Sequence, residues 1–205
     1  MQTLLGCPGI DGDEGGDRVR THLVKAMREA KQHTTWLDPD EAVEEAVVER
    51  VRTMSLDAAM GSRLAALRSQ VDRPARTAIL AHTLLALTVP GVPDLYQGSE
   101  TWHFRLVDPD NREPVAAAEV AARLDQLDAS GAVPPPDHAL AKVAVVREAL
   151  GMRARHADAF GPDATYEPLW AVGPRSDHAV AFARGADVVV VVPRLVRRLA
   201  DGWGG

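Results

Sequence analysis

Apolar side chains recur every three or four residues through most of the first 150 positions, and after residue 165 the chain changes to short β-rich runs. The first pattern is typical of helices with one buried face, and the second is typical of strands. Asp17 is expected to cap a first helix that reaches about Gln32. The expected helices together cover residues 17–32, 39–54, 56–71, 74–87, 115–127 and 138–156.

Two of these helices have clear start signals. Asp38 can cap the second helix, Pro39 suits its first position, and Glu41 then stands three residues on and completes a capping box. Ser55 is expected to cap the third helix. Pro74 is expected to begin a separate fourth helix, because proline interrupts the hydrogen-bond ladder of any helix that contains it.

Three short runs after residue 165 are rich in β-branched and aromatic residues and are separated by turn-forming segments. They predict three strands in an antiparallel meander. The run Val188–Val192 is wholly apolar and would pair with another chain if it stood at an uncovered edge. A sheet this small therefore predicts that neighbouring elements are missing. The three expected strands are Tyr166–Val172, His178–Ala183 and Asp187–Val192.

Composition and charge narrow the class of protein. The 205 residues carry 23 basic and 29 acidic side chains, a net charge of −6, and show no basic stripe, which argues against a nucleic-acid partner. The longest apolar run, Ala78–Val89, is too short to span a bilayer, so no membrane association is expected. The single cysteine, Cys7, excludes an internal disulfide and is expected to pack rather than react. These features predict a soluble cytoplasmic protein.

Motifs for bound groups are missing from the sequence. The acidic, glycine-rich residues 8–16 do not follow the ligand order of an EF-hand, and the seven histidines are scattered without metal-ligand spacing. No glycine-rich phosphate loop is present. The sequence therefore predicts no metal ion and no cofactor.

The stretch Thr88–Pro114 interrupts the periodic pattern with prolines, glycines, polar side chains and aromatic rings. Residues 92–96 are long enough for one short strand, and Gly98 would end it. A surface loop with this many hydrogen-bonding groups and aromatic faces suits a polyol ligand, although residues of these types also form ordinary solvated turns.

The order of residues in this stretch carries a resemblance. PGVPDLYQGSE, residues 90–100, resembles the segment around the eighth barrel strand of the α-amylase clan of glycoside hydrolases. Trp102 and the sequence LVDPDNR at 106–112 extend the likeness to the trehalose-forming isomerases of that clan. Residues 2–6, 25–31 and 33–36 match in the same order, and the likeness covers most of the chain before it fades after about Pro193.

The resemblance implies a mainly α fold with a small β module. Residues 1–160 would form the C-terminal part of a (β/α)8 barrel, with its last helices, its eighth strand and a helical insertion. Residues 161–205 would begin a truncated antiparallel β domain. A complete barrel needs about 250 residues, more than the chain contains.

The implied activity is conversion of the reducing-end α-1,4 bond of a malto-oligosaccharide into an α,α-1,1 bond by a retaining mechanism. In the family, the nucleophile, the general acid/base and the stabilising carboxylate lie on earlier strands, so no catalytic residue is assigned here. Glu100, Asp108 and Asp110 are poor substitutes, because a proline-broken loop does not hold a working carboxylate pair rigidly. The chain alone is expected to be inactive, and its expected partners are the malto-oligosaccharide and the missing N-terminal part of the barrel.

The resemblance also implies a share of the substrate pocket. Trp102 would stack on a pyranose face, and the polar residues of 108–112 would bond sugar hydroxyls. Asp110 and Arg112 have an equally plausible role as a salt bridge within the loop. His103, Phe104 and Glu113 depart from the family pattern. The complete set of expected substrate-binding residues is Lys31, Trp36, Tyr96, Gln97, Glu100, Trp102, Asp108, Asp110, Asn111 and Arg112.

Two other functions compete with this one. The chain could be a non-catalytic helical interaction or sugar-binding module. It could also be a fragment of another α-amylase clan hydrolase or transglucosylase that shares the late barrel.

Overall fold

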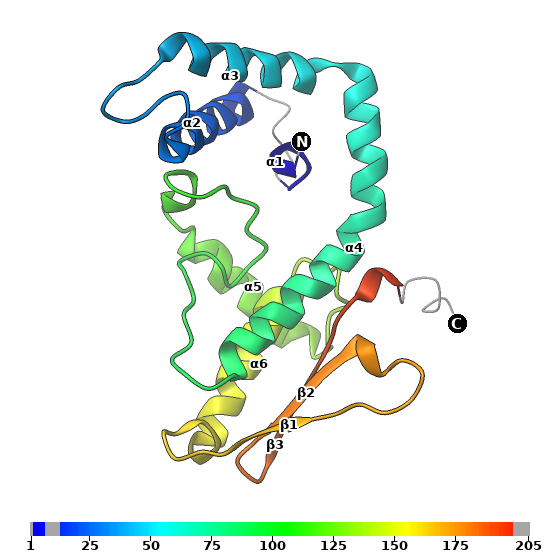
Figure 1. The fold of residues 1–205 in the computed structure, drawn as a ribbon. Coiled ribbons are helices and arrows are strands. Elements are labelled where there is room, and N and C mark those ends of the chain that lie inside the picture. The colour runs from blue at the N-terminus through cyan, green and yellow to red at the C-terminus, as the bar shows by residue number, and fades with distance from the viewer. Residues whose placement is uncertain (1, 7–12, 199–205) are drawn as a thin grey trace. The chain divides into compact units, whose positions relative to one another are not determined.

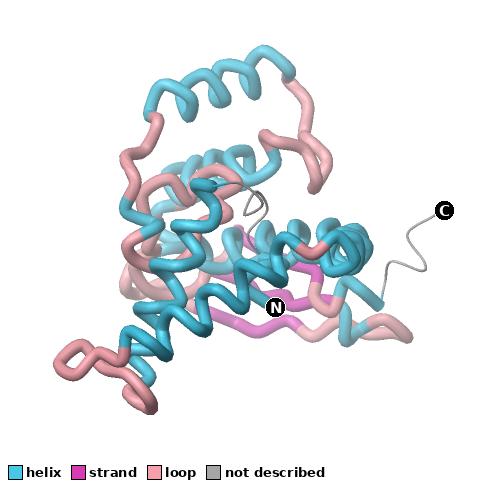
Figure 2. The backbone as a smooth tube through the Cα atoms, turned by 90° about the horizontal axis from the view of Figure 1, so that it is seen from above, coloured by secondary structure: helices cyan, strands magenta, loops and turns pink. Residues whose placement is uncertain are grey.

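The structure, a computed structural model, describes residues 2–6 and 13–198 (Figure 1). Helices dominate it, and a single three-stranded sheet lies near the C-terminal end of the described chain (Figure 2). The predicted mainly α fold with a small antiparallel β module is thereby confirmed. The helices are α1 (Gln2–Gly6), α2 (Asp13–Ala30), α3 (Glu41–Leu56), α4 (Ala58–Thr88), α5 (Ala117–Ser130) and α6 (Ala141–Arg155), and the strands are β1 (Tyr166–Leu169), β2 (Ala179–Arg184) and β3 (Val188–Pro193).

The chain divides into two compact units. Residues 1–70 and 103–114 form the first unit, and residues 71–102 and 115–205 form the second. Helix α4 runs through both, and the division falls between Gln70 and Val71. This grouping differs from the predicted division near residue 160, which concerns a longer protein and stays a prediction.

Helix α4 corrects the prediction of two separate helices around Pro74. The structure has one 31-residue helix with Pro74 inside it. Pro74 has no N–H to donate to the carbonyl of Gln70, but the loss of one bond does not end a helix whose flanking turns are continuous.

The first unit has a small apolar core. Leu4 of α1, Val19 of α2 and Leu64 of α4 are buried together. Arg68 of α4 donates hydrogen bonds to the carbonyls of Leu4 and, at 3.2 Å, Leu5. These carbonyls belong to the last turn of α1 and lack helical partners, so Arg68 ties α1 to α4.

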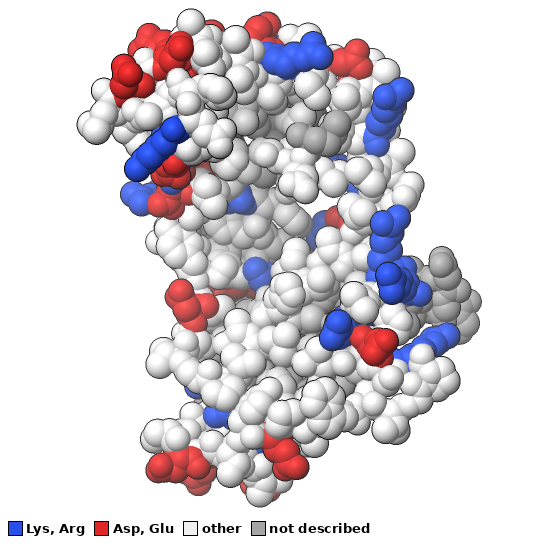
Figure 3. Space-filling view, viewed as in Figure 1, with Lys and Arg blue, Asp and Glu red and all other residues white. Residues whose placement is uncertain are grey.

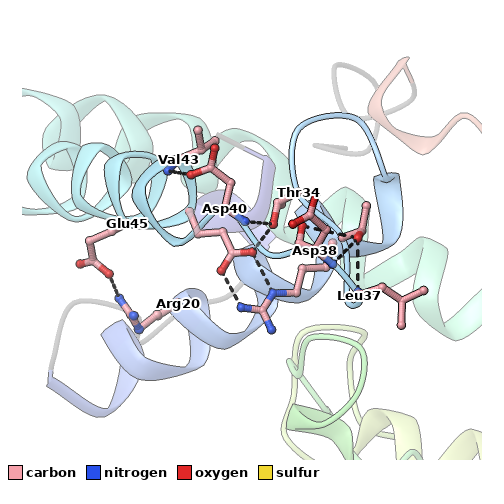
Figure 4. Close-up of polar contacts among 10 residues, drawn as sticks. Arg20, Thr34, Leu37, Asp38, Asp40, Val43 and Glu45 are labelled. Carbon is pink, nitrogen blue, oxygen red and sulfur yellow. Dashed lines mark hydrogen bonds and ion pairs between the residues drawn. The ribbon is translucent and has the colours of Figure 1, made fainter.

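Helix α3 begins two residues later than the capping signal predicts. The capping residue is Asp40, whose carboxylate accepts a hydrogen bond from the Val43 N–H at 3.0 Å, and not Asp38 (Figure 4). Asp38 is held outside the helix because its own N–H donates to the Thr35 hydroxyl at 2.9 Å. The helix can begin only after that turn is complete.

Other predicted boundaries also change. Helix α2 begins at Asp13, so Asp17 lies inside it rather than at its cap. Asp57, not Ser55, precedes α4, and its carboxylate accepts a bond from the Met60 N–H at 2.7 Å. Residues 137–140 form turns before α6, which starts at Ala141. Cys7 lies outside the described residues.

The second unit is built on the sheet. Its strand order is β1-β2-β3, all antiparallel, with Phe182 opposite Val190, which confirms the predicted meander. Phe182 and Val190 are buried against Ala81 of α4 and Ala159, whereas Val189 points outward and is 62% exposed. Alternate residues of β3 therefore face opposite sides, as the two-residue period of a strand requires.

The predicted strand at residues 92–96 is wrong. The structure gives this segment no regular secondary structure, and within the described residues the only sheet is the one of β1, β2 and β3. A strand needs a hydrogen-bonded neighbour, and Pro93 removes one of the donors that such pairing uses. No helix that the structure describes combines the length and the apolar character needed to cross a bilayer.

Candidate functional site

The polar segment 103–114 of the first unit is anchored by Asp110. The Asp110 carboxylate accepts hydrogen bonds from Arg18 of α2, at 2.6 Å from Nε and 2.9 Å from Nη2. The Leu106 N–H donates to the same carboxylate at 2.6 Å. The bonds from Arg18 outweigh the effect of burial and hold the pKa of Asp110 below its ordinary value. Asp110 therefore fixes the loop to α2, a role its sequence neighbours did not reveal.

Arg112 pairs with Asp108 rather than with Asp110. Its Nη2 lies 2.5 Å from Asp108 Oδ2, and the bond lowers the pKa of Asp108. Asn111 also donates to Asp108, and its own amide oxygen is buried without a hydrogen-bond partner. This end of the loop is the more exposed one, since 67% of the Arg112 side chain is accessible.

A second charged network joins α2 to α3. Arg28 donates to Glu44 from Nε at 2.8 Å and from Nη2 at 2.7 Å, and the Thr34 hydroxyl donates to Glu44 Oε1 at 2.5 Å. The bond from Arg28 is the main reason that the pKa of Glu44 falls to about 2. Thr34 also accepts a bond from the Asp40 N–H at 3.0 Å, so the network reaches the start of α3 (Figure 4).

Trp36 lies beside this network. The guanidinium carbon of Arg28 is 5.1 Å from the centre of the Trp36 ring, a cation–π distance. Trp36 is 54% exposed. Lys31 is also exposed and follows α2 with a positive φ of 54°.

A pocket of about 810 Å³ opens between α2, α3 and the loop. Trp36 and Arg28 line it, and Pro109 brings the 103–114 segment to its wall. Among the predicted site residues of the first unit, Trp36 lines this pocket, and Pro109, which lies between Asp108 and Asp110, lines it too.

The other predicted site residues belong to the second unit. Trp102 is half-buried; its indole N–H donates to the His138 carbonyl at 2.9 Å, and Arg76 lies 5.0 Å from its ring centre. Tyr96 and Gln97 are exposed. Trp102 therefore has a clear packing role, while its sugar contact stays a prediction.

Glu100 has an unusual setting in the same unit. One of its carboxylate oxygens is buried without a hydrogen-bond partner among the described residues. The charge of Glu100 also acts on the half-buried Lys142, whose pKa is lowered by its own burial more than Glu100 can raise it. Glu100 and Lys142 are both partly buried charges, and the sequence did not connect them.

Sequence reasoning missed Arg18, Arg28 and Glu44. Each is distant from its partner in the sequence, so spacing alone could not pair them. A partial signal was present at Glu44, because it lies four residues before the buried Val48 on one face of α3. In the described chain, no group of three or more potential ligands could hold a metal ion. On the surface shown in Figure 3, acidic and basic side chains are interspersed.

Comparison with known proteins defines the class. No protein-family model matches the chain. A Mycobacterium tuberculosis protein that carries the name maltooligosyl trehalose synthase is 42% identical over 206 residues, which cover 98% of this chain and 25% of the relative. The chain thus spans about a quarter of the length of the curated relatives it matches.

Solved structures agree with this match. The maltooligosyltrehalose synthase of Arthrobacter ramosus shares 37% identity with a TM-score of 0.81, over 92% of this chain and 25% of that one. The glycosyltrehalose synthase of DSM5389 shares 30% identity with a TM-score of 0.73, over 90% of this chain and 23% of that one. The relatives are therefore synthases of glycosylated trehalose.

The particular relatives are the maltooligosyl trehalose synthases, and the chain is a homologue of their C-terminal portion. The resemblance found in the sequence is confirmed.

Proposed function

We propose that this chain is the part of a trehalose-forming isomerase that helps to hold the reducing-end glucose of a malto-oligosaccharide. The enzyme would convert the terminal α-1,4 bond into an α,α-1,1 bond. The observation that carries the proposal is the match to maltooligosyl trehalose synthases over 98% of the chain. In that enzyme, residues 1–160 would close a (β/α)8 barrel and residues 161–205 would begin a β domain, in the cytoplasm.

The reaction is an intramolecular transfer. In a retaining mechanism, a carboxylate attacks the anomeric carbon while an acid protonates the oxygen of the leaving glucose. The freed glucose then turns, and its anomeric hydroxyl attacks the anomeric carbon of the glycosyl-enzyme. The hydroxyl proton passes to the group that acted as the acid, now the base, and the bond from the anomeric carbon to the carboxylate breaks. The reaction is an isomerisation only if the glucose stays bound and water is kept out.

The polar segment 103–114 suits the task of retaining glucose. Asp110 is committed to Arg18 and to the Leu106 N–H, so it would hold the segment in place. Asp108 and Arg112 would then offer hydrogen-bonding groups to sugar hydroxyls, because they lie at the more exposed end, and Asn111 would support them by donating to Asp108. A fixed loop positions such groups better than a free one, since less conformational entropy is lost on binding.

The chain alone would not catalyse the reaction. Asp108 and Asp110 have depressed pKa values and are paired with arginines, so neither suits the proton transfer of a general acid. Glu44 and Glu45 of α3 line an open pocket, but each is paired with an arginine. The reactive carboxylates would come from the remaining three-quarters of the enzyme.

A segment exchange tests the proposal. The equivalent quarter of the Arthrobacter ramosus enzyme is replaced by this chain, and the product is given maltopentaose. Loss of reducing ends without release of free glucose is the expected result, and the 205-residue chain alone should produce no change. A folded hybrid that releases mainly glucose or shorter dextrins would favour a hydrolase instead, and a hybrid that folds but does nothing would favour a binding or interaction module.

A further inference from the structure

We infer that the pocket between α2 and α3 of the first unit is a binding site for a neutral pyranose sugar, with Trp36 as its stacking platform. The inference deepens the proposed function, on which it rests only for the choice of an α-glucan as the sugar. It uses contacts within the first unit alone.

The size and lining of the pocket fit a short sugar. Its volume of about 810 Å³ lies in the range of 300–1,000 Å³ that is common for small-molecule sites. Trp36 is the large aromatic residue at its wall, and more than half of that side chain is accessible. An indole ring left open beside hydrogen-bonding groups is costly to keep in water and well suited to the apolar face of a pyranose.

The charge at the wall selects a neutral ligand. Three basic residues, Arg20, Lys25 and Arg28, line the pocket, and so do three acidic ones, Glu41, Glu44 and Glu45. Arg20 lies 2.5 Å from Glu45, and Arg28 is bound to Glu44, so these charges are compensated locally. A phosphate or a metal ion would find no net charge to bind, whereas sugar hydroxyls can donate to the carboxylates of Glu41 and Glu45 and accept from the basic side chains.

The Trp36 ring is held by a cation–π contact with Arg28. The Arg28 guanidinium lies over the Trp36 ring and is fixed by two hydrogen bonds to Glu44. Both oxygens of Glu44 are used, since Oε1 also accepts from Thr34, and its side chain is only 6% exposed. Glu44 is therefore a positioning residue: it cannot contact the sugar, but it sets where Arg28, and through it Trp36, can lie.

Ligand binding is tested by NMR on the 205-residue chain labelled with ¹⁵N. The indole N–H signal of Trp36, assigned with the Trp36→Phe variant, should shift and saturate as maltotriose is added. The signal of Trp170, which is 87% exposed and outside the pocket, is the internal control and should not move. Inorganic phosphate, added alone, should move neither. No saturable shift of Trp36 at about 50 mM maltotriose, well above a Kd of ~1 mM, would overturn the inference.

Variants separate contact from positioning by calorimetric titration with maltotriose. Trp36→Ala should weaken binding at least about five-fold, and Trp170→Ala should leave it unchanged. Glu44→Gln should weaken binding. Glu49→Gln is the matched control and should not, because Glu49 makes a similar bidentate contact with Arg52 outside the pocket. Because Glu44→Gln could loosen the fold, amide exchange in α3 is measured alongside. Lost binding with unchanged exchange supports positioning, and unchanged binding contradicts it.

The outcome is independent of the activity assay. If maltotriose binds at Trp36 but the segment-exchange hybrid does not isomerise maltopentaose, the sugar site is supported and the proposed enzyme function is contradicted. If the hybrid isomerises maltopentaose even with Trp36→Ala, and the Trp36 signal of the isolated chain does not shift, the enzyme function is supported and the sugar site at Trp36 is contradicted.

Discussion

The two units of the molecule are stabilised by different forces. In the second unit, Phe182, Val188, Val190 and Val192 form a continuous apolar layer on one face of the sheet. In the described part of the first unit, the buried apolar cluster is smaller, and arginine–carboxylate pairs add to it. Apolar burial is nearly independent of pH, whereas paired carboxylates lose their charge in acid. The comparison predicts that sequence changes and pH will act on the two units in different ways.

The largest effect is expected from Phe182→Ala. Phe182 is 1% exposed and its ring lies 5.1 Å from that of Tyr166. Removing it leaves a cavity between the sheet and α4, at a cost of about 3–5 kcal/mol in the free energy of unfolding. Hydrogen exchange read by mass spectrometry should show faster exchange in β2 and β3.

The control for this change is Val189→Ala. Val189 is 62% exposed on the other face of the same sheet, so its loss should cost less than about 1 kcal/mol. Similar effects of the two variants would mean that the sheet is not held by its inner face, and faster exchange in α2 and α3 as well would mean that the units do not unfold separately.

The sheet was the part of the fold most open to prediction from sequence. Its signal is local, because the β-branched run VVVVVP and the turns at Gly173 and Gly185 lie within the strands and their connections. The start of α3 failed because two threonine hydroxyls before it decide where the helix begins. The strand at residues 92–96 failed because its formation depends on neighbours that sequence pattern cannot supply.

The candidate site could be predicted only in part. Trp36 and the 108–112 segment were named from their resemblance to known enzymes, and the pocket brings Trp36 and Pro109 to one wall. The supports were not named, because Arg18 and Asp110 are 92 residues apart and nothing in either neighbourhood marks the pair. Contacts between distant charges are set by the packing of α2, which sequence periodicity describes only as a buried face.

An intermediate effect is expected from Asp110→Ala, which removes the anchor of the 103–114 segment. Only 7% of the Asp110 side chain is exposed, and its loss leaves Arg18 and the Leu106 N–H without their acceptor. The cost should be on the order of 2–3 kcal/mol, confined to the first unit. Exchange in residues 103–114 and in α2 is the measurement. Asp108→Ala breaks a more exposed pair and should have a much smaller effect.

The same variant tests how the stability of the first unit depends on pH. The folded-state pKa values of Asp110 and Glu44 are depressed, to about 2 for Glu44. The stability they contribute is present above the ordinary carboxyl pKa of about 4 and is lost as the pH falls towards 2. The first unit of the unchanged chain should therefore loosen in this window, and Asp110→Ala should show a weaker dependence. Unfolding of the second unit at a higher pH than the first would contradict the view that charge pairs matter more in the first unit.

The smallest effect is expected at Lys142 of α6, where the substitution should stabilise the chain rather than destabilise it. Burial lowers the pKa of Lys142, only partly offset by the charge of Glu100. Between this lowered value and the ordinary pKa of about 10.4, the unfolded chain holds the proton and the folded chain does not, so the free energy of unfolding rises with pH. Lys142→Met should stabilise the second unit at neutral pH, by less than about 1 kcal/mol, and remove the alkaline rise.

Lys142→Arg separates the charge from the side-chain length. Arginine keeps its proton throughout this pH range, so the variant should also lose the alkaline rise but gain no stability at neutral pH. Denaturant unfolding at pH 7 and pH 10 measures both quantities. A destabilised Lys142→Met would show that the attraction to Glu100 exceeds the cost of burying the amine, and the second unit would then also depend on a charge pair, as the first does.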